Sequence, residues 1–205
     1  MITFWNDIFT KVGLSGVCLD LAVSATLSFI LVILVILIGH LIDKLEQCQL
    51  RILSDTVGAK IAYFICNRLT FIGTIIHELS HALFVILTGA ILRKVCLLQI
   101  SSDGTLGHVE FALYGPKWKQ CCQLSIISCA PVFVGLLLEY ILIRTVLFHE
   151  LGFGVELFLW YLIISILDHM SMSNVDIKNY LKGMIIVYPM IFIFTLFFQY
   201  FFIVN

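Results

Sequence analysis

The sequence predicts an all-α polytopic membrane protein with about five transmembrane helices and one small β-hairpin. Hydrophobic residues make up 61% of the 205-residue chain, charged residues make up 12%, and the mean hydropathy is +1.08. Soluble domains carry about 25% charged residues and fewer apolar ones. Apolar segments long enough to cross a bilayer also recur along the chain, because about 20 apolar residues span the hydrocarbon core.

The same composition excludes two other classes of protein. Disorder requires low hydrophobicity and a high net charge, whereas this chain has a formal net charge of -1. Its 12 Lys and Arg residues do not exceed its 13 Asp and Glu residues, so no basic excess is present to neutralise phosphates. We therefore expect no nucleic-acid partner, a lipid bilayer as the surroundings, and one membrane-embedded domain over residues 1–205.

Five apolar segments are expected to form the membrane helices. They cover residues 19–42, 61–89, 124–148, 155–168 and 184–204. Between the first two, residues 43–60 mix charges of both signs and are predicted to form an interfacial or aqueous connection. The fourth segment covers only about 20 Å and leads into the polar stretch 168–176. Polar backbone at membrane depth is tolerated only where protein buries it or a water cavity receives it.

A change of sequence pattern predicts a β-hairpin over residues 95–113. Two short runs with β-branched and apolar residues, 95–101 and 106–113, flank a connection that contains Gly104. A short connection with Gly between two such runs is typical of a hairpin.

The motif that indicates chemistry is HELSH at residues 77–81, in the second apolar segment. Residues four apart lie on one face of a helix, so His77 and His81 can bind the same metal ion. Glu78, next to the first imidazole, is then placed to take a proton from water. A Glu between two His inside a membrane span is costly and by default indicates function.

A polar stripe surrounds this motif on the same helical face. Thr70, Thr74, His77, His81 and Thr88 recur at helical spacing, so the stripe is expected to face the protein interior or a water cavity. Hydroxyls bonded to their own helix would explain the Thr residues but not the His pair.

Residues 71–82 (FIGTIIHELSHA), followed by Leu87-Thr88-Gly89 and a strand-rich connection, resemble the site-2 protease family of intramembrane zinc metalloproteases. The resemblance extends over about residues 71–107. It implies a membrane-embedded zinc endopeptidase that hydrolyses peptide bonds of membrane-anchored proteins or peptides. His77 and His81 would bind Zn²⁺, and Glu78 would be the catalytic base.

The family takes its third zinc ligand, an Asp, from an Asn-Pro-x-Leu-Asp-Gly type motif in a later span, and this sequence departs from that motif. Asp176 is the preferred candidate, because a polar break near the metal would deliver its carboxylate. Asp168 keeps the Leu-Asp pair, and His169 stands where the family has Gly. Asp176 also follows Ser173 by three residues, the spacing of a helix-capping box.

Two other functions remain open at this point. A metal-binding membrane transporter would hold the ion in transit, but such proteins tend to show repeated halves, which this chain lacks. A non-catalytic membrane scaffold would not need Glu78. We expect an integral, multi-pass membrane protein of a bacterial cell membrane.

Overall fold

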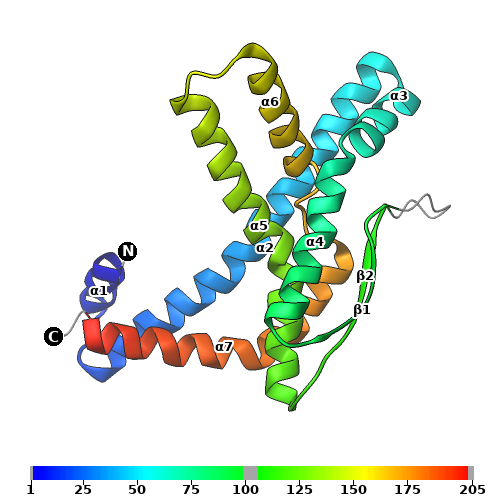
Figure 1. The fold of residues 1–205 in the computed structure, drawn as a ribbon. Coiled ribbons are helices and arrows are strands. Elements are labelled where there is room, and N and C mark those ends of the chain that lie inside the picture. Colours follow the sequence, from blue (N-terminus) through cyan, green and yellow to red (C-terminus); the bar gives the residue numbers. More distant parts are fainter. Residues whose placement is uncertain (1, 99–105, 203–205) are drawn as a thin grey trace.

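Helices form most of the computed structural model, which describes residues 2–98 and 106–202 (Figure 1). In chain order the elements are α1 (Ile2–Lys11), α2 (Val17–Val57), α3 (Ala59–Phe64), the π-helical turn η1 (Ile65–Leu69), α4 (Phe71–Leu87), β1 (Ile91–Cys96), β2 (His108–Ala112), α5 (Lys117–Phe148), α6 (Phe153–Leu167) and α7 (Asn174–Phe202).

In the part of the chain that the structure describes, three helices are long and apolar enough to cross a membrane: α2, α5 and α7. The pair formed by α3–η1 and α4 makes a fourth if it counts as one span, although it is bent by 47°. Helix α6 is apolar but has only 15 residues, or about 22 Å of helix. The structure therefore agrees with a helical membrane protein, but by length and composition it has fewer spans than the predicted five.

The charged residues after the first predicted span continue the same helix. Helix α2 continues from its apolar part to Val57 and ends at Gly58, which has a φ of 87°. Lys, Glu, Gln, Leu and Arg dominate this part, and all are good helix formers. The predicted interfacial or aqueous connection over 43–60 is therefore helical as far as Val57. Helices α5 and α7 likewise start before residues 124 and 184, because their first turns are polar but helical.

The second predicted span, 61–89, is broken at Thr70, and α6 stabilises the break. The Tyr161 hydroxyl donates to the Leu69 carbonyl at 2.8 Å. The Ser165 hydroxyl donates to the Thr70 carbonyl at 2.7 Å and accepts from the Gly73 amide at 2.8 Å. Backbone groups that leave the helical pattern inside a membrane protein need such partners.

A two-stranded antiparallel sheet is confirmed, but its first strand begins at Ile91, four residues before the predicted run 95–101, of which residues 99–101 lie outside the described residues. Ile91 pairs with Ala112 and Cys96 with His108, with one irregularity between Leu92 and Lys94. The strands run alongside α4 (Figure 1). The chain turns from α4 into β1 at Gly89, whose φ of 69° suits glycine. The expected turn, residues 101–105, lies outside the described residues.

Helix α5 is central to the packing and contacts α4, α6 and α7. The approach of α7 is close at Gly183, where a Cβ atom would lie 1.9 Å from Ser125 Oγ and 2.5 Å from the Cys121 carbonyl oxygen. The Ser125 hydroxyl donates to the Tyr180 carbonyl at 3.2 Å. These contacts hold the first turns of α7 against α5 and, through α5, near α4.

Candidate metal centre

The structure brings together three side chains that share metal-binding chemistry. His77 and His81 lie one turn apart on α4, and Asp176 lies in the first turn of α7. One ligand atom from each, two imidazole nitrogens and a carboxylate oxygen, lie within 4.8 Å of one another. Two nitrogens and one oxygen form a donor set that zinc uses in catalytic sites with an open fourth position.

Backbone carbonyls orient both imidazoles. His77 Nδ1 lies 2.6 Å from the His169 carbonyl oxygen, and His81 Nδ1 lies 2.8 Å from that of Ile127. Since a carbonyl oxygen can only accept, each Nδ1 carries a proton, and a neutral ring then has its lone pair on Nε2.

The two Nε2 atoms lie 3.2 Å apart. Two lone pairs at this distance repel each other unless a cation lies between them. Two ligands of a tetrahedral zinc ion are separated by about 3.3 Å. His81 Nε2 is also 3.7 Å from Asp176 Oδ1. The three residues therefore fit a zinc ion by donor type, and the two imidazoles fit it also by tautomer and by spacing.

Pro131 explains why the Ile127 carbonyl is available to His81. In a helix the carbonyl of residue 127 would accept from the amide of residue 131, but Pro has no amide hydrogen. The released oxygen faces α4 and accepts from His81 instead. Outer partners of this kind keep a metal-binding imidazole in one tautomer and orientation.

Asp176 uses its two carboxylate oxygens for two different purposes. Oδ2 accepts from the Ser173 amide and hydroxyl, while the Asp176 amide donates to Ser173 Oγ at 3.1 Å. These are the bonds of a capping box at the start of α7. Oδ1 faces His81. The capping role and a ligand role for Asp176 are therefore compatible.

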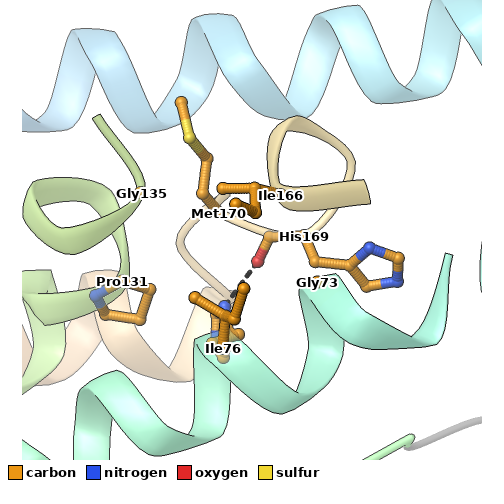
Figure 2. Close-up of a pocket in the computed structure, with 8 residues that line it drawn as sticks. Gly73, Ile76, Pro131, Gly135, Ile166, His169 and Met170 are labelled. Carbon is orange, nitrogen blue, oxygen red and sulfur yellow. Dashed lines mark hydrogen bonds between the residues drawn. The ribbon is translucent and has the colours of Figure 1, made fainter. Parts of the chain in front are cut away.

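The other two candidates for third ligand lie elsewhere. Asp168 is 3% exposed and accepts from Gln49 Nε2 at 3.0 Å. His169 contributes its carbonyl oxygen to His77, while its ring points away from that bond and its Nδ1 lies 3.1 Å from the Ser165 carbonyl (Figure 2). Among the described residues, neither side chain joins the group formed with the two imidazoles.

Glu78 borders an open polar cavity of about 240 Å³ beside the His pair. The described residues lining it are Glu46, Asn67, Thr74, His77, Glu78, Leu106, Gly107, Asp168, His169, Ser171 and Ser173. The hairpin forms part of its wall, since a Cβ atom on Gly107 would lie 2.7 Å from Glu78 Cγ. A volume of this size holds several water molecules at about 30 Å³ each. His77 and Glu78 thus both border the space that water can enter.

The polar stripe on α4 has two kinds of threonine. Thr70 and Thr88 donate to the carbonyls of Cys66 and Phe84 in their own helical segments. Thr74 is 4% exposed, and its Oγ1 has no hydrogen-bond partner among the described residues. Thr74 is also one of the residues that line the cavity.

Several residues that shape the centre were not found by sequence reasoning. Gln49 and Ser165 lie in helices without any motif, and Gly73, inside the stretch 71–82, was given no role of its own. Of the three, only Gly73 had a local sequence signal, because it is a glycine inside an apolar helix. It lets α4 approach α6 closely, since a Cβ atom there would lie 1.8 Å from the Ser165 carbonyl oxygen.

Comparisons with protein-family models, curated proteins and solved structures give no match for this chain.

Proposed function

We propose that this protein is an intramembrane zinc metalloendopeptidase that hydrolyses peptide bonds of membrane-anchored proteins or peptides. One observation carries the proposal: two imidazole Nε2 atoms and Asp176 Oδ1 converge among apolar helices, and His77 and Glu78 line the adjoining cavity. Buried groups of this kind are costly in a membrane and are retained where they serve function. The proposal places the chain as a multi-pass protein, with a bacterial cell membrane as its expected location.

In this proposal His77, His81 and Asp176 hold the zinc ion, and Glu78 transfers protons. Zinc, when bound, supplies Lewis-acid polarisation to water and to the scissile carbonyl. Glu78 takes the proton of the attacking water as its oxygen bonds to the carbonyl carbon. Glu78 then gives that proton to the leaving nitrogen as the carbon–nitrogen bond breaks. The carbonyls of His169 and Ile127 keep both imidazoles in the binding tautomer.

The decisive experiment compares the wild type with Glu78→Gln, both purified in detergent. We expect about one zinc per chain in both proteins, and cleavage of a library of membrane-spanning peptides by the wild type alone. Loss of a general base typically lowers the rate by about 10²–10⁴-fold. Chelation should stop wild-type cleavage, and added zinc should restore it. The matched control is Glu139→Gln, which removes a buried carboxylate on α5 outside the described cavity lining.

A wild type without bound metal, or a Glu78→Gln variant that cleaves normally, would refute the protease. Metal bound by both proteins with no cleavage by either would instead favour a transporter or a non-catalytic scaffold.

Single substitutions identify the third ligand. Asp176→Ala should lose zinc, whereas Asp168→Ala and His169→Ala should retain it, because the His169 contact to His77 uses the backbone. Zinc lost from Asp168→Ala but kept by Asp176→Ala would show that the ligand set is wrong.

A further inference from the structure

The cavity beside Glu78 has an unusual charge composition. Three carboxylates line it, those of Glu46, Glu78 and Asp168, and none of its described lining residues is Lys or Arg. Glu46 accepts from Ser171 Oγ at 3.1 Å, and Asp168 accepts from Gln49 Nε2 at 3.0 Å. Both hydrogen-bond donors are neutral. Among residues 2–98 and 106–202, no cationic side chain forms an ion pair with either carboxylate.

A metal ion bound by the two imidazoles and Asp176 would not provide a counter-charge for Glu46 and Asp168. A divalent ion on the imidazoles and Asp176, together with the Glu78 carboxylate beside it, makes that end of the cavity close to neutral. Glu46 and Asp168 then remain without a cationic partner among the described residues. Asp168 is only 3% exposed, so water alone solvates it poorly.

A second feature indicates a ligand at the same place. Thr74 lines the cavity and is 4% exposed, yet its hydroxyl has no partner among the described residues. Buried hydroxyls are almost always hydrogen-bonded in folded proteins, so an unpartnered one at a cavity wall calls for a group that enters the cavity. A hydroxyl oxygen can accept from an ammonium or a guanidinium group, as the two carboxylates can.

We propose that this cavity binds a cationic group of the substrate, a Lys ammonium or an Arg guanidinium close to the cleaved peptide bond. The inference rests on the proposed protease function and names its substrate class. Burying a carboxylate is costly unless an opposite charge accompanies it, so a basic side chain gains more from this cavity than an apolar one. Lys and Arg are also common at the ends of membrane spans, where such a protein would meet them.

The test compares peptides of about 20 apolar residues that are identical except for one Lys, Leu or Glu, placed in turn at each position flanking the cleaved bond. For the wild type we expect a position at which kcat/KM is about tenfold or more higher for Lys than for Leu, and lowest for Glu. Glu46→Gln and Asp168→Asn should reduce this preference. Each substitution removes a charge but keeps an oxygen that accepts from Ser171 or Gln49, so the hydrogen bonds are preserved. Asp43→Asn, on the same helix as Glu46 but outside the described cavity lining, should keep the preference.

A binding measurement separates recognition from cleavage. On the inactive Glu78→Gln background, fluorescence anisotropy should give a lower Kd for the Lys peptide than for the Leu peptide, and Asp168→Asn should abolish the difference. Equal cleavage and equal binding of all three peptides, with Glu78→Gln inactive, would overturn this inference and leave the protease standing. A second zinc per chain that Glu46→Gln removes would also overturn it, in favour of a second metal site. Absence of zinc and of cleavage would refute the proposed function itself.

Discussion

At the scale of single residues, the centre depends on backbone carbonyls that have lost their usual helical partners. The Ile127 carbonyl is free because Pro131 lacks an amide hydrogen, and the His169 carbonyl is free because it follows the end of α6. Each accepts from one imidazole Nδ1. These two carbonyl groups therefore determine which nitrogen of each His is available for a metal, although no sequence motif identifies them.

Pro131→Ala tests this dependence. The new amide hydrogen at residue 131 would bond to the Ile127 carbonyl and compete with His81 Nδ1. We expect zinc affinity to fall by about 10–100-fold, the usual effect of losing an outer partner of a ligand. The measurement is zinc titration against a competing chelator in detergent.

The matched control for that experiment is Pro189→Ala. Pro189 lies inside α7, and no described His contact involves the carbonyl four residues before it. Its zinc affinity should equal that of the wild type. Equal affinities for all three proteins would show that the proline has no part in orienting His81.

At the scale of elements, α6 acts as a short support helix for the broken pair around Thr70. Its Ser165 hydroxyl joins the Thr70 carbonyl to the Gly73 amide, and its C-terminal end leads directly into the loop that contacts His77. The close approach of α4 and α6 at Gly73 therefore positions both the HELSH helix and the loop over it.

Gly73→Ala should separate these two helices. The added Cβ atom would lie 1.8 Å from the Ser165 carbonyl oxygen and 2.8 Å from His169 Nδ1. Overpacking of this kind costs about 1–3 kcal/mol, which in a chain of this size lowers Tm by roughly 2–12 °C. Thermal unfolding in detergent measures this decrease in Tm, and the zinc affinity should fall in parallel.

The control is Gly154→Ala in α6, where a Cβ atom meets nothing within 4 Å. Ala also has the higher helix propensity, so Tm should stay equal or rise slightly. If Gly73→Ala unfolded at the wild-type temperature, the close approach of α4 and α6 would have no energetic importance.

At the scale of the whole molecule, the apolar surface requires lipid. Only 6% of the most apolar window of α7 and 22% of that of α2 are buried inside the molecule. Polar side chains lie instead between these two helices: Gln199 is 1% exposed, donates to Asp20 at 3.0 Å and accepts from the Ser24 hydroxyl at 3.1 Å. This arrangement, polar inside and apolar outside, is typical of helices packed in a membrane.

This apolar surface predicts how the protein behaves when membranes are extracted. The expressed protein should remain in the membrane fraction after an alkaline carbonate wash and dissolve only with detergent, because burial of its apolar surface does not depend on charge. Immunoblots of the supernatant and the pellet measure this. Release into the carbonate supernatant would contradict the membrane assignment.

The sequence correctly predicted the structural features that depend on residues close together in the chain. Hydropathy indicated apolar helices, a change of period indicated the hairpin, and four-residue spacing placed His77 and His81 on one face, because each property depends on residues within one or two turns. The helical state of residues 43–57 was not predicted, because their charge indicated only an interfacial or aqueous connection; nothing before Gly58 breaks the helix.

The sequence by itself determined the membrane class and the pairing of His77 with His81 beside Glu78. Only the tertiary structure decided that Asp176, and not Asp168 or His169, lies beside the two imidazoles. It also decided which carbonyls orient them, through contacts that join residues 46 and 92 positions apart in the chain. Such contacts depend on how α5 and α6 pack against α4 and how α7 packs against α5, and no local sequence pattern predicts helix packing.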